Sequence, residues 1–147
     1  MNAGDGDDLL LRVYNQELIA LSGQAAQPRH LAHPELTAKA VSPICGSEVA
    51  VELNLQGDKI AAFGYEVESC ALTKAVVAVM AKAIPGKNRE EVAQAGEALK
   101  AMLSGAPAPT GDWAALKILE PVREYKARHN AILLPFEAVE KAFQKKI

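Results

Sequence analysis

The feature that most constrains the fold is an alternation of apolar and polar residues that begins at Glu48. Every second position is apolar, as in a strand with one buried face: Val49, Val51, Leu53 and Leu55. Residues 56–59 (QGDK) have the composition of a tight turn, and residues 60–67 return as a partner strand. We therefore predict an antiparallel β-hairpin from Glu48 to Val67.

Helical patterns lie on both sides of this hairpin. Residues 24–43 contain three prolines and no period, so we expect a connecting loop there. Residues 88–105 have the pattern of an amphipathic helix with Asn88 at its N-cap. The predicted helical segments are 7–23, 69–87, 88–105, 112–120 and 131–147, and Pro135 would delay the start of the last one. A short antiparallel sheet with helices packed on it is an α+β fold.

Length and charge limit the classes of protein that the chain can belong to. Its 147 residues suit one domain over residues 9–147 after a flexible N-terminal tail of residues 1–8. The formal net charge of -2 argues against a nucleic-acid or membrane-surface partner. No apolar run is long enough to span a bilayer, and the acidic N-terminus is unlike a secretory signal. We therefore expect a cytoplasmic protein whose thiols stay reduced.

The two cysteines lie on either side of the predicted hairpin. Strand pairing would bring the loop that carries Cys45 next to Cys70, which follows the return strand. Cys70 would also start a helix, where backbone N–H groups favour the thiolate. His129 would immediately precede the last helix, whereas His30 and His33 are expected on a solvated loop. Spacing alone favours two ordinary cysteines over a metal site, because the sequence has no CxxC and no zinc-finger pair.

Two segments carry motifs of a known family: SPICGSEVAVELNLQGDKIAAFGYEVESCALTKA and VREYKARHNAILLPFEAVEKA. The first resembles the NifU/IscU-type iron–sulfur scaffold family, in which N-P-x-C-G-D leads into a hairpin and a second cysteine starts a helix. The second resembles the SufU-like branch of that family. The resemblance implies a NifU/IscU-like α+β domain in which three cysteines and an aspartate or histidine hold zinc or a [2Fe–2S] cluster. The first two cysteines of the motif fall on Cys45 and Cys70.

The other ligand positions of the family are altered in this chain. Ser47 stands where the family has an aspartate after C-G. A gap-free alignment puts the third cysteine at Ala131, and a shift of one residue would put the His–Cys pair of the IscU type on His129 and Asn130. His129 is therefore a candidate third ligand. Ser47, Asn130 and Ala131 occupy ligand-like positions without ligand chemistry.

The resemblance implies a scaffold or carrier for iron–sulfur cluster assembly. It would bind iron, a transient [2Fe–2S] cluster or zinc through Cys45 and Cys70. Its partners would be a cysteine desulfurase and cluster-recipient apoproteins, and a homodimer could complete the ligand set. Two alternatives stay open: a sulfur acceptor for the desulfurase, or a degenerate member that acts as an interaction or regulatory module without a cluster. The sequence contains no catalytic dyad or triad, so we do not predict an enzyme that turns over a small substrate.

Overall fold

The predicted hairpin is present in the computed structural model, which describes residues 15–43 and 46–145. Strand β2 (Glu48–Gln56) pairs antiparallel with β3 (Lys59–Glu68) across a two-residue turn. Gly57 in this turn has a φ of 66°, a left-handed conformation that residues with a Cβ rarely adopt. The alternation correctly predicts that Val49, Val51 and Leu53 are buried, whereas Leu55, which follows a shift in register, is only half-buried.

The expectation of a plain loop over residues 24–43 is wrong. Residues Leu36–Val41 form a third strand, β1, which pairs antiparallel with β2 and gives a sheet of order β1-β2-β3. The only buried side chains of β1 are those of Ala38 and Ala40. Alanine has a low preference for strands, so this segment carries little strand signal of its own.

Long-range contacts hold β1 at the edge of the sheet. The Lys145 ammonium donates to the backbone carbonyl of Thr37, with Nζ and O 2.8 Å apart. The Lys141 ammonium donates to the backbone carbonyl of Lys39, with Nζ and O 3.3 Å apart. Both lysines lie more than a hundred residues away in the chain, and they satisfy carbonyls that an edge strand would otherwise leave open.

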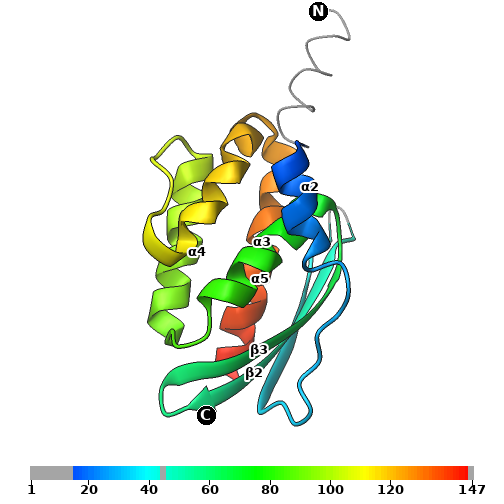
Figure 1. Ribbon diagram of the computed structural model, residues 1–147, viewed down its shortest axis with the longest axis vertical. Helices are drawn as coiled ribbons and strands as arrows, with labels where there is room; N and C mark the ends of the chain where they lie inside the picture. Colours follow the sequence, from blue (N-terminus) through cyan, green and yellow to red (C-terminus); the bar gives the residue numbers. More distant parts are fainter. Residues whose placement is uncertain (1–14, 44–45, 146–147) are drawn as a thin grey trace, which may run out of the picture.

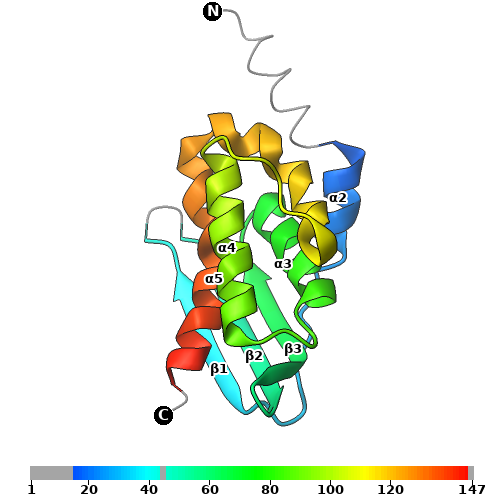
Figure 2. The ribbon, with the colours of Figure 1, turned by 90° about the vertical axis from the view of Figure 1, so that its left-hand side faces the viewer.

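The helices lie on one face of the sheet (Figures 1 and 2). Their bounds are α2 Gln16–Gly23, α3 Ala71–Ala83, α4 Arg89–Leu103 and α5 His129–Gln144, with 3-10 helices η1 Gly111–Glu124 and η2 Lys126–Arg128. Helices α3 and α5 pack against the strands, and α4 packs on the outer side of α5 (Figure 2). In the part of the chain that the structure describes, no helix combines the length and apolar character needed to cross a membrane.

Most of the predicted helices are confirmed, with shifted bounds. Helix α4 begins at the expected cap, where the Asn88 and Glu91 side chains form a capping box. The short helix predicted before Pro121 is instead a 3-10 helix that continues through this proline to Glu124. Helix α5 starts at His129 and is not delayed by Pro135. Residues 7–14 of the first predicted helix, and the tail at residues 1–8, lie outside the described residues.

The Arg123 side chain joins η1 to the end of α4. Its Nε donates to the carbonyl of Met102 at 2.6 Å, and its Nη2 donates to the carbonyl of Ala106 at 2.5 Å. Met102 lies in the last turn of α4 and Ala106 in the loop beyond it, so one guanidinium connects the end of the helix to the segment that follows. Arg123 therefore fixes the path of the chain from α4 to the start of α5.

We expect Arg123→Lys to lower the free energy of unfolding by about 1–3 kcal/mol. An ammonium group cannot reproduce the two-pronged geometry, so one carbonyl would lose its donor. Urea denaturation followed by circular dichroism measures the change. Arg128→Lys, at an exposed position, is the matched control and should leave stability unchanged. Equal stability of the two variants would contradict a stabilising role for these two Arg123 hydrogen bonds.

Candidate functional site

Cys70 lies between β3 and α3, as the sequence predicts, and forms the N-cap of α3. Its backbone is extended, with φ -74° and ψ 170°, and its side chain is half-buried. The sulfur lies 3.7 Å from the hydroxyl oxygen of Thr73, one turn into the helix. The thiol is therefore next to the unsatisfied N–H groups of the first helical turn.

Two opposing effects set the acidity of this thiol. Burial raises the pKa of Cys70, because it disfavours the charged form. The backbone N–H groups of Thr73 and Leu72, with the side chain of Ser69, stabilise the thiolate and lower the pKa. The second effect outweighs the first, so the pKa of Cys70 lies below that of an ordinary cysteine. Cys70 is thus both a better nucleophile and a better metal ligand near neutral pH.

A cavity of about 260 Å³ lies in front of Cys70. Three segments line it: the residues that lead into β2, the junction of β3 with α3, and the region where η2 meets α5. The lining residues are Gly46, Ser47, Glu68, Ser69, Cys70, Ala127, Arg128 and Ala131. The cavity thus gathers parts of the chain that are distant in sequence around one thiol.

The hairpin register explains why Ser47 reaches this cavity. Glu48 pairs with Glu68, so the residue before β2 faces the residue after β3. The hydroxyl oxygens of Ser47 and Ser69 lie 2.8 Å apart. Cys45 itself lies outside the described residues, but it is bonded to Gly46, which lines the cavity.

A series of hydroxyl groups connects the cavity to α5. The hydroxyl of Ser69 is 2.8 Å from that of Thr73, and Thr73 donates to the backbone carbonyl of Ala131 at 3.0 Å. Pro135 lies four residues after Ala131 and has no N–H group, so this carbonyl has no intrahelical donor. Thr73, which is fully buried, supplies the missing hydrogen bond from α3.

The structure separates the predicted ligand-like residues into two groups. Ser47 and Ala131 line the cavity beside Cys70, whereas Asn130 is exposed and is not part of the lining. His129 also lies outside the lining, and its Nε2 donates to the backbone carbonyl of Val122 at 2.9 Å. A carbonyl can only accept, so Nε2 carries the proton and Nδ1 is the nitrogen that can act as a ligand.

Within residues 15–43 and 46–145, no three His, Cys, Asp or Glu side chains are grouped so that they could hold a metal ion. Cys70 is therefore the central donor of the described site, and the ligand role of Cys45 and His129 stays a prediction. The predicted surface location of His30 and His33 is confirmed, because both are exposed. His30 bridges the carboxylates of Glu52 and Glu66 outside the Cys70 cavity.

Sequence reasoning missed Thr73 and Arg128 as parts of the site. Two spacings could have indicated the role of Thr73. Ser69 and Thr73 are four residues apart at a helix start, which puts both hydroxyls on one face. Pro135 four residues after Ala131 predicts a free carbonyl at Ala131, although not which side chain donates to it.

We expect the Cys70 thiolate to persist to lower pH than that of an unstructured cysteine. In a Cys45→Ser variant, the rate of alkylation by iodoacetamide should rise with pH around a midpoint below that of a cysteine-containing tripeptide. In urea the midpoint should return to the ordinary value, because the N–H and hydroxyl donors are lost. A folded midpoint at or above that of the tripeptide would show that burial dominates.

We also expect Thr73 and Pro135 to be energetically coupled. Thr73→Val keeps the shape of the side chain but leaves the Ala131 carbonyl without a donor, at a cost of about 1–3 kcal/mol in unfolding free energy. In a Pro135→Ala background, the new N–H can serve this carbonyl, so the same substitution should cost much less. Thermal or urea unfolding of the four proteins completes the double-mutant cycle.

The control for this cycle is Thr37→Val, at an exposed position of β1, which should change stability by less than about 0.5 kcal/mol. Additive effects of Thr73→Val and Pro135→Ala would refute the coupling.

Comparison with known proteins agrees with this architecture. The family model of the NifU-like N terminal domain matches residues 22–131. A crystal structure of a nitrogen-fixing NifU-like protein (N-terminal) from Brucella abortus superposes with a TM-score of 0.86 at 36% identity, covering 92% of this chain and 95% of that one.

Two further relatives are more distant. The zinc-dependent sulfurtransferase SufU of Bacillus subtilis (strain 168) is 27% identical over 105 residues, 71% of each protein. A Fervidobacterium islandicum AW-1 structure, provisionally described as an iron–sulfur cluster assembly scaffold protein for the SUF system, has a TM-score of 0.80 at 23% identity. It covers 90% of this chain and 97% of that one, and its likeness supports the fold. The matched family model and the Brucella structure show that this chain belongs to the family of NifU-like N-terminal domains.

Proposed function

We propose that this chain is an iron–sulfur cluster assembly protein that acts in the cytoplasm as a scaffold or carrier. One observation carries the proposal: a thiol of lowered pKa at the start of α3 opens onto a cavity, in a chain of the NifU-like family. A thiolate at a helix N-terminus is suited to bind iron or zinc, or to take up sulfur. The iron, the sulfur or the assembled cluster would be what the protein carries, and not a permanent cofactor of its own.

Cys45 and Cys70 are the proposed cargo ligands, with His129 as a third. Two thiolates, an imidazole and water would suit tetrahedral zinc. A [2Fe–2S] cluster needs four ligands, so the remaining positions must come from a second copy of the chain, a small thiol or a recipient protein. Ser47 and Ala131 line the cavity without offering a carboxylate or a thiolate. We therefore propose weak, transient binding rather than a permanent metal centre.

The second candidate function is that of a sulfur acceptor for a cysteine desulfurase. Two observations favour it: the lowered pKa of Cys70, and the similarity to a protein named as a sulfurtransferase. The Cys70 thiolate would attack the outer sulfur of the persulfide on the desulfurase. A new S–S bond forms on Cys70, the old one breaks, and the desulfurase cysteine leaves as a thiolate. No external oxidant or reductant is needed.

The test is the content of metal and acid-labile sulfide in protein purified without oxygen. We expect zinc or iron in the parent, and its loss in Cys45→Ala and in Cys70→Ala. Ala131→Cys places a third thiol at the cavity wall and should increase resistance to a chelator by about tenfold or more, because thiolates are the preferred ligands. If the metal content were the same in the parent and in the Cys45→Ala, Cys70→Ala and Ala131→Cys variants, the scaffold function would be refuted.

The sulfur-acceptor function has its own readout. After incubation with a cysteine desulfurase and cysteine, mass spectrometry should find one added sulfur atom on Cys70. A parent that takes up neither metal nor sulfur would instead indicate the third alternative, a family member without cluster chemistry.

A further inference from the structure

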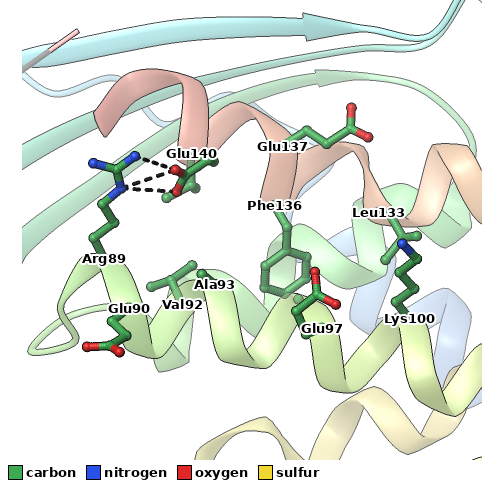
Figure 3. Close-up of a pocket in the computed structure, with 12 residues that line it drawn as sticks. Arg89, Glu90, Val92, Ala93, Glu97, Lys100, Leu133, Phe136, Glu137 and Glu140 are labelled. Carbon is green, nitrogen blue, oxygen red and sulfur yellow. Dashed lines mark hydrogen bonds and ion pairs between the residues drawn. The ribbon is translucent and has the colours of Figure 1, made fainter. Parts of the chain in front are cut away.

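A second concave region of the molecule lies away from Cys70, between α4 and α5. This α4–α5 groove has a volume of about 640 Å³. Its floor is apolar and is formed by Val92, Ala93, Gly96, Leu133, Phe136 and Val139. Figure 3 shows the Phe136 ring reaching from α5 toward α4. None of the residues that line the Cys70 cavity lines this groove.

The close approach of the two helices depends on Gly96. A Cβ at this position would lie 3.1 Å from two carbon atoms of the Phe136 ring. The ring therefore covers the glycine and forms the middle of the floor. On either side of it, the partly exposed Leu133 and the exposed Ala93 leave apolar surface in contact with solvent.

The rim of the groove is acidic. Its charged residues are four glutamates against one arginine and one lysine: Glu90, Glu97, Glu137, Glu140, Arg89 and Lys100. Arg89 does not neutralise the other glutamates, because it donates to the Glu140 carboxylate at one end of the groove (Figure 3). Glu97 on α4 and Glu137 on α5 are both exposed and lie on opposite walls. Neither carboxylate has a cationic partner among the described ion pairs.

We propose that the α4–α5 groove is a docking site for a basic amphipathic helix of another protein. A groove between two packed helices accepts a third helix, whose apolar ridge at i, i+3 or i+4 and i+7 would cover the Phe136 floor. Lysine or arginine residues on both flanks of that helix would pair with Glu97 on one wall and Glu137 on the other. Charge complementarity of this kind selects a partner and speeds its association.

The same charges disfavour a second copy of the chain as the occupant. A symmetric dimer through this groove would bring the acidic rims of the two copies together, and among the described ion pairs only Glu140 on each rim is already paired, with Arg89. Like charges brought together across an interface are costly, and the single free lysine on each rim does not balance them. The acidic rim therefore argues for a partner with a different, basic surface.

The test uses two synthetic helical peptides of equal length. Both have leucines along one ridge, and they carry either lysines or glutamates on the flanks. Fluorescence anisotropy at low salt measures binding to the full chain, and amide chemical shifts locate it. We expect the lysine peptide to bind and to shift amides of α4 and α5 that line the groove. The glutamate peptide should bind about tenfold more weakly or worse.

Charge reversal in the protein provides the matched comparison. Glu97→Lys with Glu137→Lys should weaken binding of the lysine peptide by about tenfold or more and strengthen that of the glutamate peptide. The control, Glu17→Lys with Glu124→Lys, makes the same change in net charge at exposed positions outside the groove and should alter affinity less than about twofold. Thermal melts verify that both double variants are folded.

Several results would overturn the proposal. These are equal binding of the two peptides, binding of neither, shifts outside the groove, or an equal effect of the control variant. A dimer of the parent chain that the groove variants dissociate would identify a second copy as the occupant and would also refute it. Because the two sites share no residue, failure of this test leaves the proposed function of Cys70 unaffected.

Discussion

The hydrogen bond from Thr73 to the carbonyl of Ala131 holds the candidate site together. It exists because Pro135 removes the N–H group that would otherwise serve this carbonyl within α5. The freed carbonyl is buried, so it needs a donor from another element, and the first turn of α3 supplies one. This places the start of α5 against the start of α3, and the cavity in front of Cys70 lies at that junction.

Two ligand-like positions around this junction are altered: Ser47 stands where the family resemblance places an aspartate, and Ala131 where it places a third cysteine. Ser47, Ser69 and Thr73 form a neutral series that ends on a backbone carbonyl. The N–H groups at the start of α3 still stabilise the Cys70 thiolate, but neutral hydroxyls do not offset the charge of a metal ion as a carboxylate does. The altered positions therefore weaken the hold on a cation more than they weaken the reactivity of Cys70 as a nucleophile. This balance is the physical basis for proposing transient cargo and for keeping sulfur transfer as a second candidate.

The parts of the fold that depend on local signals could be predicted from the sequence. The alternation in β2, the Gly57 turn and the Asn88 cap each act within a few residues, and each is found in the structure. Strand β1 could not be predicted in this way, because its buried side chains are two alanines and its edge is satisfied by Lys141 and Lys145. At the site, Cys70 was predictable from its place before a helix. The partner of the Ala131 carbonyl was not, because it comes from an element 58 residues away in sequence.

Helix α5 serves both concave regions, and its geometry keeps them apart. Ala131 faces the Cys70 cavity, whereas Leu133, two residues later, lines the α4–α5 groove. A step of two residues turns the side chain by roughly 200° around the helix axis, so the two side chains leave opposite sides of α5. A helix seated in the groove would therefore cover none of the residues around Cys70. Since Pro135 and Thr73 fix the first turns of α5 against α3, a partner held on its outer face would leave the thiol open to a sulfur donor or a recipient protein.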